Sequence, residues 1–327
     1  EDLTVWVDGS VRVAELADLL SRAGQWLPVD IPDQGGQTVA ELVGAGEWGP
    51  LAPAFGRLRD LVLGAVVDTP GRGRLRLGGQ VMKNVAGFDL VRAVSGSRGR
   101  LGDIRKVVFR LLPVPQVHRV LTWSSTGSAT LALDEIANRL CTHPVLPASL
   151  VRGHGADGVE RLHLRLLGSK ATVEAEAAEL LELASGGVVW AGAPDQADPL
   201  GDDPIGRHFG SVGLGRGLVE IRGGPAAVAE VEAELDGLGL RGAWRYHLPA
   251  WHIWRLAVDR EALAAAGDGL VRLVRELRVR GGDGALLRGV EGDVGGDSLE
   301  GQPDLGRWTP SDVLEVERAV AAAVTGG

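Results

Sequence analysis

Two prolines, Pro113 and Pro115, separate parts of the chain that differ in hydrophobic pattern. Before them, short apolar stretches alternate with glycine-rich segments; after them, strand-like and helix-like stretches alternate. Proline cannot donate to a sheet ladder, so it ends the strand predicted over 107–112. A chain of 327 residues also exceeds the usual size of a single hydrophobic core. We therefore predict two domains, at 1–117 and 118–290, followed by a C-terminal tail at 291–327.

Residues 1–117 are predicted to form a small sheet that contains a hairpin. Strands are predicted over 3–7, 61–67, 74–77 and 107–112, and helices over 11–23 and 39–43. Pro70-Gly71 supplies a turn between the second and third of these strands, and Gly24 is a suitable end for the first helix. The glycine-rich stretch 35–53 is otherwise predicted as a loop, and loops of that length usually carry function.

The second part suggests two β-α-β-β-α-β-like units joined by the Gly, Pro and Asp-rich link 192–217. Strands are predicted over 117–123, 159–167, 188–190, 218–222, 244–247, 251–258 and 284–288. Helices are predicted over 128–140, 170–184, 225–235 and 260–277. The pattern as a whole favours an α+β protein with an α/β second domain.

Composition excludes several classes of protein. A net charge of −9 and a pI near 5.4 argue against a nucleic-acid partner, and no apolar run is long enough for a transmembrane segment. Cys141 is the only cysteine, so this chain holds no disulfide, cysteine-rich zinc site or iron–sulfur cluster of its own. The first residues lack a secretory signal, which predicts a cytoplasmic protein. With Met82 the only methionine, we expect that the sequence is trimmed or begins inside a longer polypeptide.

Glycines crowd the interval from Gly78 to Gly102. Such spacing lets backbone N–H groups approach an anionic or planar ligand, although tight turns in a β-domain would have a similar composition. Neither the G-x-G-x-x-G fingerprint between a strand and a helix nor the P-loop motif occurs.

The literal strings are more specific than the composition. They read Gly78-Gly79-Gln80-Val81-Met82-Lys83-Asn84-Val85-Ala86-Gly87-Phe88-Asp89-Leu90, then Gly96-Ser97-Arg98-Gly99-Arg100-Leu101-Gly102-Asp103-Ile104, with Gly56-Arg57-Leu58-Arg59-Asp60-Leu61-Val62-Leu63-Gly64 upstream. Residues 1–117 thereby resemble the FAD-binding (GlcE-type) subunits of glycolate oxidase, within the vanillyl-alcohol-oxidase-like, PCMH-type FAD-binding flavoproteins. The resemblance implies a PCMH-type FAD-binding domain followed by an α/β cap domain of ferredoxin-like units.

The same resemblance implies FAD as the cofactor and assigns contacts to it. By motif position the expected cofactor-binding residues are Thr38, Gly49, Pro50, Gly56, Arg59, Asp60, Lys83, Asn84, Gly96, Ser97, Gly99, Leu101, Gly102 and Ile104. A hydroxyl such as that of Ser97 can donate to a phosphate oxygen.

Departures from the family pattern leave a second interpretation open. The usual T-x-G-G reads Thr38-Val39-Ala40-Glu41, and the usual S-G-P-R reads Trp48-Gly49-Pro50-Leu51. A carboxylate at Glu41 would repel a pyrophosphate, Trp48 is bulky where the family has a small residue, and the first phosphate loop, upstream of the strand at 3–7, is absent from this sequence. The alternative is therefore a non-catalytic scaffold subunit that keeps the fold and binds FAD weakly or not at all.

The function implied by the resemblance is that of the FAD-binding subunit of a glycolate-oxidase-like 2-hydroxy-acid oxidoreductase, with hydride transfer from substrate to flavin. Such a subunit is not expected to act alone: it implies a second flavoprotein subunit and an iron–sulfur subunit, and through them a place peripheral to the inner membrane.

The sequence does not identify the catalytic residues. A base for the substrate hydroxyl and an arginine for its carboxylate have candidates in His247, His252, Arg245, Arg255 and the pair Arg207-His208. The competing interpretation is an amphipathic hairpin around Trp244, Trp251 and Trp254, packed in a core or an interface. No metal site is predicted, because no acidic ligand lies between His247 and His252.

Overall fold

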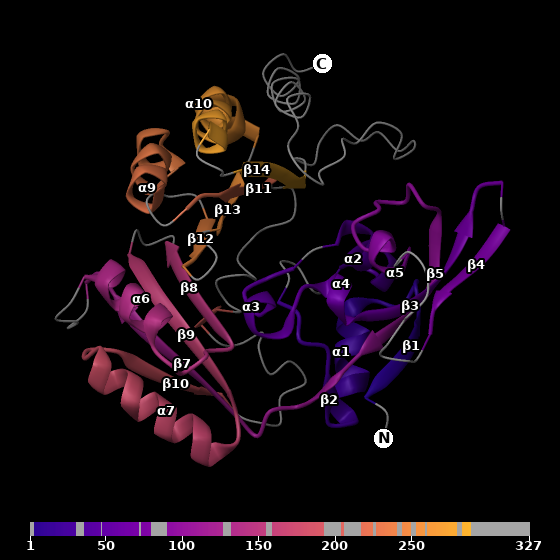
Figure 1. Cartoon of the computed structure of the whole chain (residues 1–327), viewed down its shortest axis with the longest axis horizontal. Coiled ribbons are helices and arrows are strands. Elements are labelled where there is room, and N and C mark those ends of the chain that lie inside the picture. The colour runs from indigo at the N-terminus through magenta and orange to yellow at the C-terminus, as the bar shows by residue number, and fades with distance from the viewer. Residues whose placement is uncertain are drawn as a thin grey trace.

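The computed structural model describes residues 3–30, 36–46, 48–71, 73–79, 90–126, 132–154, 159–192, 204–205, 217–224, 227–240, 244–249, 253–258, 260–279 and 283–288. Within them, the chain builds a four-stranded sheet in its first part and an eight-stranded sheet in its second (Figure 1). A third, two-stranded sheet pairs β2 (Gln25–Trp26) with β6 (Leu112–Pro113). The predicted α+β fold is confirmed.

The four-stranded sheet is antiparallel, in the order β1-β5-β3-β4. Its strands are β1 (Thr4–Asp8), β3 (Val62–Thr69), β4 (Gly73–Gly78) and β5 (Asp103–Arg110). The helices of this part are α1 (Val13–Arg22), α2 (Val39–Ala45), α3 (Ala52–Phe55), α4 (Leu58–Leu61) and α5 (Leu90–Val94). The hairpin predicted around Pro70-Gly71 is present as the pair β3–β4.

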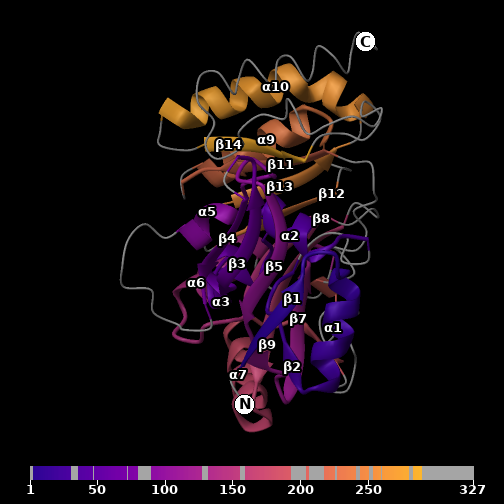
Figure 2. The ribbon, with the colours of Figure 1, turned by 90° about the vertical axis from the view of Figure 1, so that its right-hand side faces the viewer.

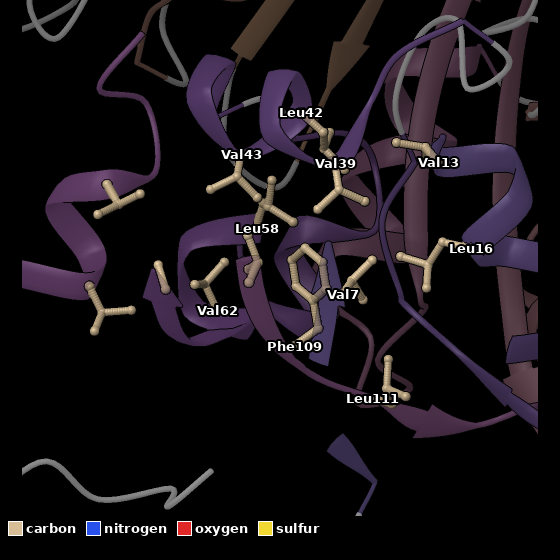
Figure 3. Packing of buried hydrophobic residues seen from close by; sticks show 14 of the residues in the cluster. Val7, Val13, Leu16, Val39, Leu42, Val43, Leu58, Val62, Phe109 and Leu111 are labelled. Atoms are coloured by element: carbon tan, nitrogen blue, oxygen red, sulfur yellow. The ribbon is translucent and has the colours of Figure 1, made fainter. Parts of the chain in front are cut away.

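One face of this sheet forms the first hydrophobic core. Val7 and Phe109 on the sheet meet Leu16 of α1 and Val39 and Leu42 of α2, with side chains that point toward one another in Figure 3. Burial of such side chains is the main stabilising contribution to a core of this kind.

The ends of α1 and β5 show how glycine and proline in the sequence limit a helix and a strand. The helix α1 stops before Gly24, whose φ of +67° lies in the left-handed region that glycine adopts without strain, as predicted. The strand predicted over 107–112 begins earlier, at Asp103, and ends at Arg110. Pro113 then lies in the short strand β6, a peripheral position that proline tolerates.

The second sheet is continuous and antiparallel, in the order β10-β7-β9-β8-β12-β13-β11-β14. Its strands are β7 (Val117–Ser124), β8 (Ser149–His154), β9 (Glu160–Gly168), β10 (Val188–Gly192), β11 (Gly217–Arg222), β12 (Trp244–Leu248), β13 (Ile253–Val258) and β14 (Asp283–Arg288). Its helices are α6 (Leu133–Thr142), α7 (Lys170–Leu183), α9 (Val228–Gly237) and α10 (Arg260–Val279).

This sheet consists of two β-α-β-β-α-β units of the ferredoxin-like kind. In each unit the fourth strand pairs with the first, the first with the third, and the third with the second. The units join edge to edge through their second strands, with Tyr246 of β12 opposite Gly153 of β8. Figure 2 shows α9 and α10 over the second unit and α7 at the other end of the sheet.

The strand β8 was not predicted, and its burial explains why. Leu150 packs toward the helices and Val151 points to the opposite face, yet both are buried. A strand buried on both faces lacks the polar–apolar alternation by which a strand is recognised. The predicted helices at 128–140 and 225–235 begin later, at Leu133 and Val228, and parts of both predicted ranges lie outside the described residues.

Within the described part of the chain, no helix combines the length and the apolar character that crossing a membrane requires.

Candidate cofactor site

The turn that precedes β5 is joined by its backbone to the end of α2. Gly96 donates its N–H to the Val43 carbonyl at 2.9 Å, and Arg98 donates to the Gly44 carbonyl at 2.9 Å. A Cβ on Gly46 would lie 2.8 Å from the Gly96 Cα, closer than real Cβ contacts allow. Glycine at this position is therefore required for the two segments to meet.

An unpaired hydroxyl and two glycines lie at this junction. Among the described residues, and apart from chain neighbours and the backbone of α2 itself, no heavy atom lies within 4 Å of the position that a Cβ would take on Gly44 or on Gly96. The side chain of Ser97 is buried, with 7% of its surface exposed, and its Oγ has no hydrogen-bond partner among the described residues. Burying a hydroxyl without a partner costs free energy. The junction thus holds a buried hydroxyl that is unpaired among the described residues, next to two glycines.

Thr38 lies at the opposite end of α2, where it forms a capping box with Glu41. The Glu41 Oε2 accepts from the Thr38 amide at 2.7 Å and from its hydroxyl at 2.8 Å, and the Glu41 amide donates to Thr38 Oγ1 at 3.3 Å. The carboxylate that we expected to repel a pyrophosphate is thus occupied at the start of the helix. α2 is about 10 Å long, which separates Thr38 from the Gly96 junction.

Gly49 and Pro50 are buried between the two parts of the chain. A Cβ on Gly49 would lie 1.7 Å from the Asp30 carbonyl oxygen, so the two backbones are in direct contact. The neighbouring Trp48 is 5% exposed, and the guanidinium carbon of Arg255 lies 3.9 Å from the centre of its ring. The ring of Trp48 thus lies against Arg255 of β13, and the guanidinium carbon of Arg57 lies 4.7 Å from its centre.

Gly56 lies in the turn between α3 and α4, and Arg59 and Asp60 lie in α4. Asp60 Oδ2 accepts from the Arg57 amide at 3.0 Å, and Asp60 Oδ1 is 3.3 Å from Arg92 Nη2 of α5. Gly56 has a φ of +89° and Arg59 is exposed. Through these two contacts Asp60 orders the turn before α4. The side chain of Arg59, by contrast, is exposed to solvent.

The last predicted residues continue from the turn into β5. Gly102 has a φ of +116°, and a Cβ there would lie 2.2 Å from the Asp68 carbonyl oxygen. Its amide donates to the Gly99 carbonyl at 2.9 Å. Leu101 is 41% exposed, and Ile104 packs against the first core. Of this segment, Ser97 alone among the predicted residues presents a buried polar side-chain atom.

Asp68, which sequence reasoning missed, is the centre of a charge cluster beside this turn. Its carboxylate accepts from Arg74 Nε at 2.7 Å and Nη2 at 3.0 Å, and from Arg105 Nε at 2.8 Å. The hydrogen bonds from these arginines lower the pKa of Asp68 to about 2. The signal in the sequence was the hairpin itself, which places Asp68 directly opposite Arg74.

Several predicted residues lie outside the described residues: Lys83, Asn84, Arg207, His208 and His252. Of Arg245, only the backbone is described, in β12.

The remaining catalytic candidates lie on opposite faces of the large sheet. His247 is 4% exposed and stacks on Trp254, with ring centroids 4.2 Å apart. Arg255 follows Trp254 in β13, so its side chain projects to the other face, where it contacts Trp48. A base at His247 and an arginine at Arg255 cannot hold one small 2-hydroxy acid between them. Trp254 is buried among α9 and α10, as the packed interpretation of the β12–β13 hairpin predicts. Trp251 lies outside the described residues, and of Trp244 only the backbone is described.

Among the described residues, no group of three or more His, Cys, Asp or Glu side chains could hold a metal ion.

The architecture is that of an α+β protein in which a four-stranded sheet with glycine-rich turns is followed by a sheet of paired ferredoxin-like units. Alkyldihydroxyacetonephosphate synthase has the same fold: one structure superposes with a TM-score of 0.61 at 15% identity, over 87% of this chain and 59% of the other. A second structure of that protein gives a TM-score of 0.60.

Sequence comparison adds relatives whose names state an activity. The chain is 41% identical over 119 residues to glycolate oxidase subunit GlcE of Escherichia coli, covering 36% of this chain and 33% of the relative. It is 29% identical over 152 residues to glycolate oxidase subunit GlcD of Bacillus subtilis, covering 46% and 32%. It is 32% identical over 116 residues to mitochondrial D-lactate dehydrogenase [cytochrome] of Arabidopsis thaliana, covering 36% and 20%.

The matched segments span a third or less of these relatives. No protein-family model matches the chain. The relatives and the shared fold nevertheless confirm the predicted resemblance to glycolate oxidase subunits, within the PCMH-type FAD-binding flavoproteins.

Proposed function

We propose that this chain is the FAD-binding subunit of a 2-hydroxy-acid oxidoreductase of the glycolate oxidase type. The observation that carries the proposal is the junction of α2 with the Gly96 turn, where Ser97 buries a hydroxyl that is unpaired among the described residues, next to Gly44 and Gly96. The identity of 41% to a glycolate oxidase subunit supports the choice of cofactor and of reaction class.

The residues present fit a bound dinucleotide at this junction. Ser97 would donate its hydroxyl proton to a phosphate oxygen, and the absence of a side chain at Gly44 and Gly96 would let that oxygen approach. The carboxylate of Glu41 is hydrogen-bonded to Thr38 at the start of α2. When bound, FAD would supply the acceptor for a hydride from the substrate carbon.

The same proposal places the chain in a multi-subunit enzyme. The relatives named GlcE and GlcD are subunits of glycolate oxidase. A second flavoprotein subunit and an iron–sulfur subunit are the partners we propose, and the chain would depend on them for turnover. Because Cys141 is the only cysteine of this sequence, an iron–sulfur cluster would have to be bound by such a partner.

A non-catalytic scaffold subunit is the second candidate. It is favoured by the segment Trp48–Gly49–Pro50, which is buried against the second domain, where the resemblance would place a loop for the cofactor. In this alternative the fold is kept for assembly, and FAD binds weakly or not at all.

A matched pair of serine variants tests the proposal. FAD is titrated into the purified protein and its dissociation constant is measured from the quenching of flavin fluorescence. We expect Ser97→Ala to raise the dissociation constant by about 10- to 100-fold, the loss of one hydrogen bond to a charged group. Ser149→Ala is the control, because Ser149 also buries an unpaired hydroxyl but lies in β8 of the large sheet. Equal affinity of both variants and the unmodified chain for FAD would contradict the placement of the phosphate at Ser97.

A further inference from the structure

Two buried arginines of the large sheet reach into the first domain. Arg165 of β9 has no exposed surface and donates from Nη1 to Asp30 Oδ2 at 2.7 Å. Arg255 of β13 is 1% exposed and donates from Nη1 to the backbone carbonyl of Trp48. The first arginine comes from one ferredoxin-like unit and the second from the other.

The two segments that they contact also touch each other. The Gly49 backbone lies directly against the Asp30 carbonyl, at a distance that leaves no room for a Cβ. Asp30 and Trp48 are themselves 4% and 5% exposed. The arginines of both units thus converge on one buried structure made of Asp30 and the segment 48–50.

Both contacts have the geometry of specific attachments. The planar guanidinium of Arg255 lies over the Trp48 ring, 3.9 Å from its centre, while one of its N–H groups binds the carbonyl of the same residue. The ion pair of Arg165 with Asp30 is almost entirely removed from water. Removing one partner of such a pair leaves an uncompensated charge in the interior, so the surroundings must rearrange.

We propose that Arg165 and Arg255 are positioning residues that hold segment 48–50 in place and so set how the cap sheet meets the cofactor domain. The idea rests on the proposed function, because the family resemblance is what assigns Gly49 and Pro50 to the cofactor. The arginines act through Asp30 and Trp48 and not through contact with substrate. Each ferredoxin-like unit is attached separately, so the loss of either attachment loosens the same segment.

Hydrogen–deuterium exchange measures the positioning directly. The reporters are the amides of Ala52, Phe55 and Gly56, which donate to Gly49, Leu51 and Ala52 in that order. We expect Arg255→Gln and Arg165→Gln each to accelerate exchange over 49–56 by about tenfold or more, as the loss of a buried charge-assisted hydrogen bond implies. Exchange in α7 should stay unchanged. Arg119→Gln is the control, because the guanidinium of Arg119 pairs with Glu174 of α7 at 2.7 Å instead of with segment 48–50.

The lysine variants separate positioning from a general loss of folding. Arg165→Lys keeps a cation that can donate to Asp30, and Arg255→Lys keeps a cation over Trp48, so both should fold and show exchange between that of the glutamine variants and the unmodified chain. Unchanged exchange over 49–56 in all four variants, or an equal rise in α7, would overturn the proposal.

FAD titration of the same proteins keeps the two proposals distinct. We expect the glutamine variants to bind FAD about tenfold more weakly and with a shifted flavin absorbance band, and the lysine variants to recover part of both. If the unmodified chain binds no FAD, the proposed function fails, while the exchange data still decide whether the arginines hold segment 48–50.

Discussion

Ser97 and Ser149 each bury a hydroxyl that has no partner among the described residues, but only Ser97 lies at the junction of the Gly96 turn with α2. Without FAD, replacing such a hydroxyl with hydrogen removes an unsatisfied polar group. We expect Ser97→Ala to leave the free energy of unfolding unchanged or to raise it by up to about 1 kcal/mol, measured by urea denaturation of the FAD-free protein. A loss above about 1 kcal/mol would show that Oγ has a structural partner instead.

Because folding lowers the pKa of Asp68, the free energy of unfolding should depend on pH in the acidic range. Its pKa in the folded protein is about 2 against an ordinary value of 3.8, so the ionised form is favoured by folding. The stabilisation is therefore complete above about pH 4 and fades as the pH falls toward 2. Urea denaturation of Asp68→Asn should show a deficit relative to the unmodified chain at pH 6 that shrinks between pH 4 and pH 2. A deficit that is constant over this range would assign the effect to something other than the carboxylate.

At the scale of elements, α2 depends on the capping box of Thr38 and Glu41. Thr38→Ala removes the oxygen that accepts from the Glu41 amide, and we expect a loss of about 1 kcal/mol in the free energy of unfolding. Glu41→Gln should lose less, because a glutamine side chain still accepts from the Thr38 amide. Glu15→Gln in the first turn of α1 is the control. A larger loss for Glu41→Gln than for Thr38→Ala would contradict the geometry of the cap.

Elements with a local signal were predictable from the sequence, and elements defined by distant contacts were not. The spacing of Val13, Leu16 and Leu20 predicts α1, and alternation together with Pro70-Gly71 predicts the β3–β4 hairpin. β8 escaped prediction because its neighbours on both faces bury it. For the candidate site, the string around Ser97 pointed to the hydroxyl that the structure leaves buried and unpaired, whereas the sequence alone suggested a repulsion at Glu41 that the capping box removes.

The contacts that join the two domains had no signal in the sequence. Arg165 and Asp30 are 135 residues apart, and Arg255 and Trp48 are 207 apart. Local patterns carry no information about pairings at such separations. From the sequence we could judge only that Trp48 is bulky where the family has a small residue. The structure shows that its ring packs against Arg255 of β13.

At the scale of the whole molecule, two ferredoxin-like units share one sheet because their second strands pair at β8–β12. The duplication was visible as a repeated order of strands and helices but not as repeated residues, since the units share only hydrophobic spacing. The helices cover one face of this sheet, and the opposite face carries the arginines that bind the first domain. Two buried arginines thus attach the large sheet to the part of the chain that we propose binds FAD.

An absorbance spectrum of the purified full-length protein tests the central claim most directly. The account predicts flavin bands in near-stoichiometric amount, or their appearance after incubation with FAD and removal of the excess. A folded protein that shows no flavin bands after such incubation would contradict FAD binding and leave the scaffold subunit as the function of this fold.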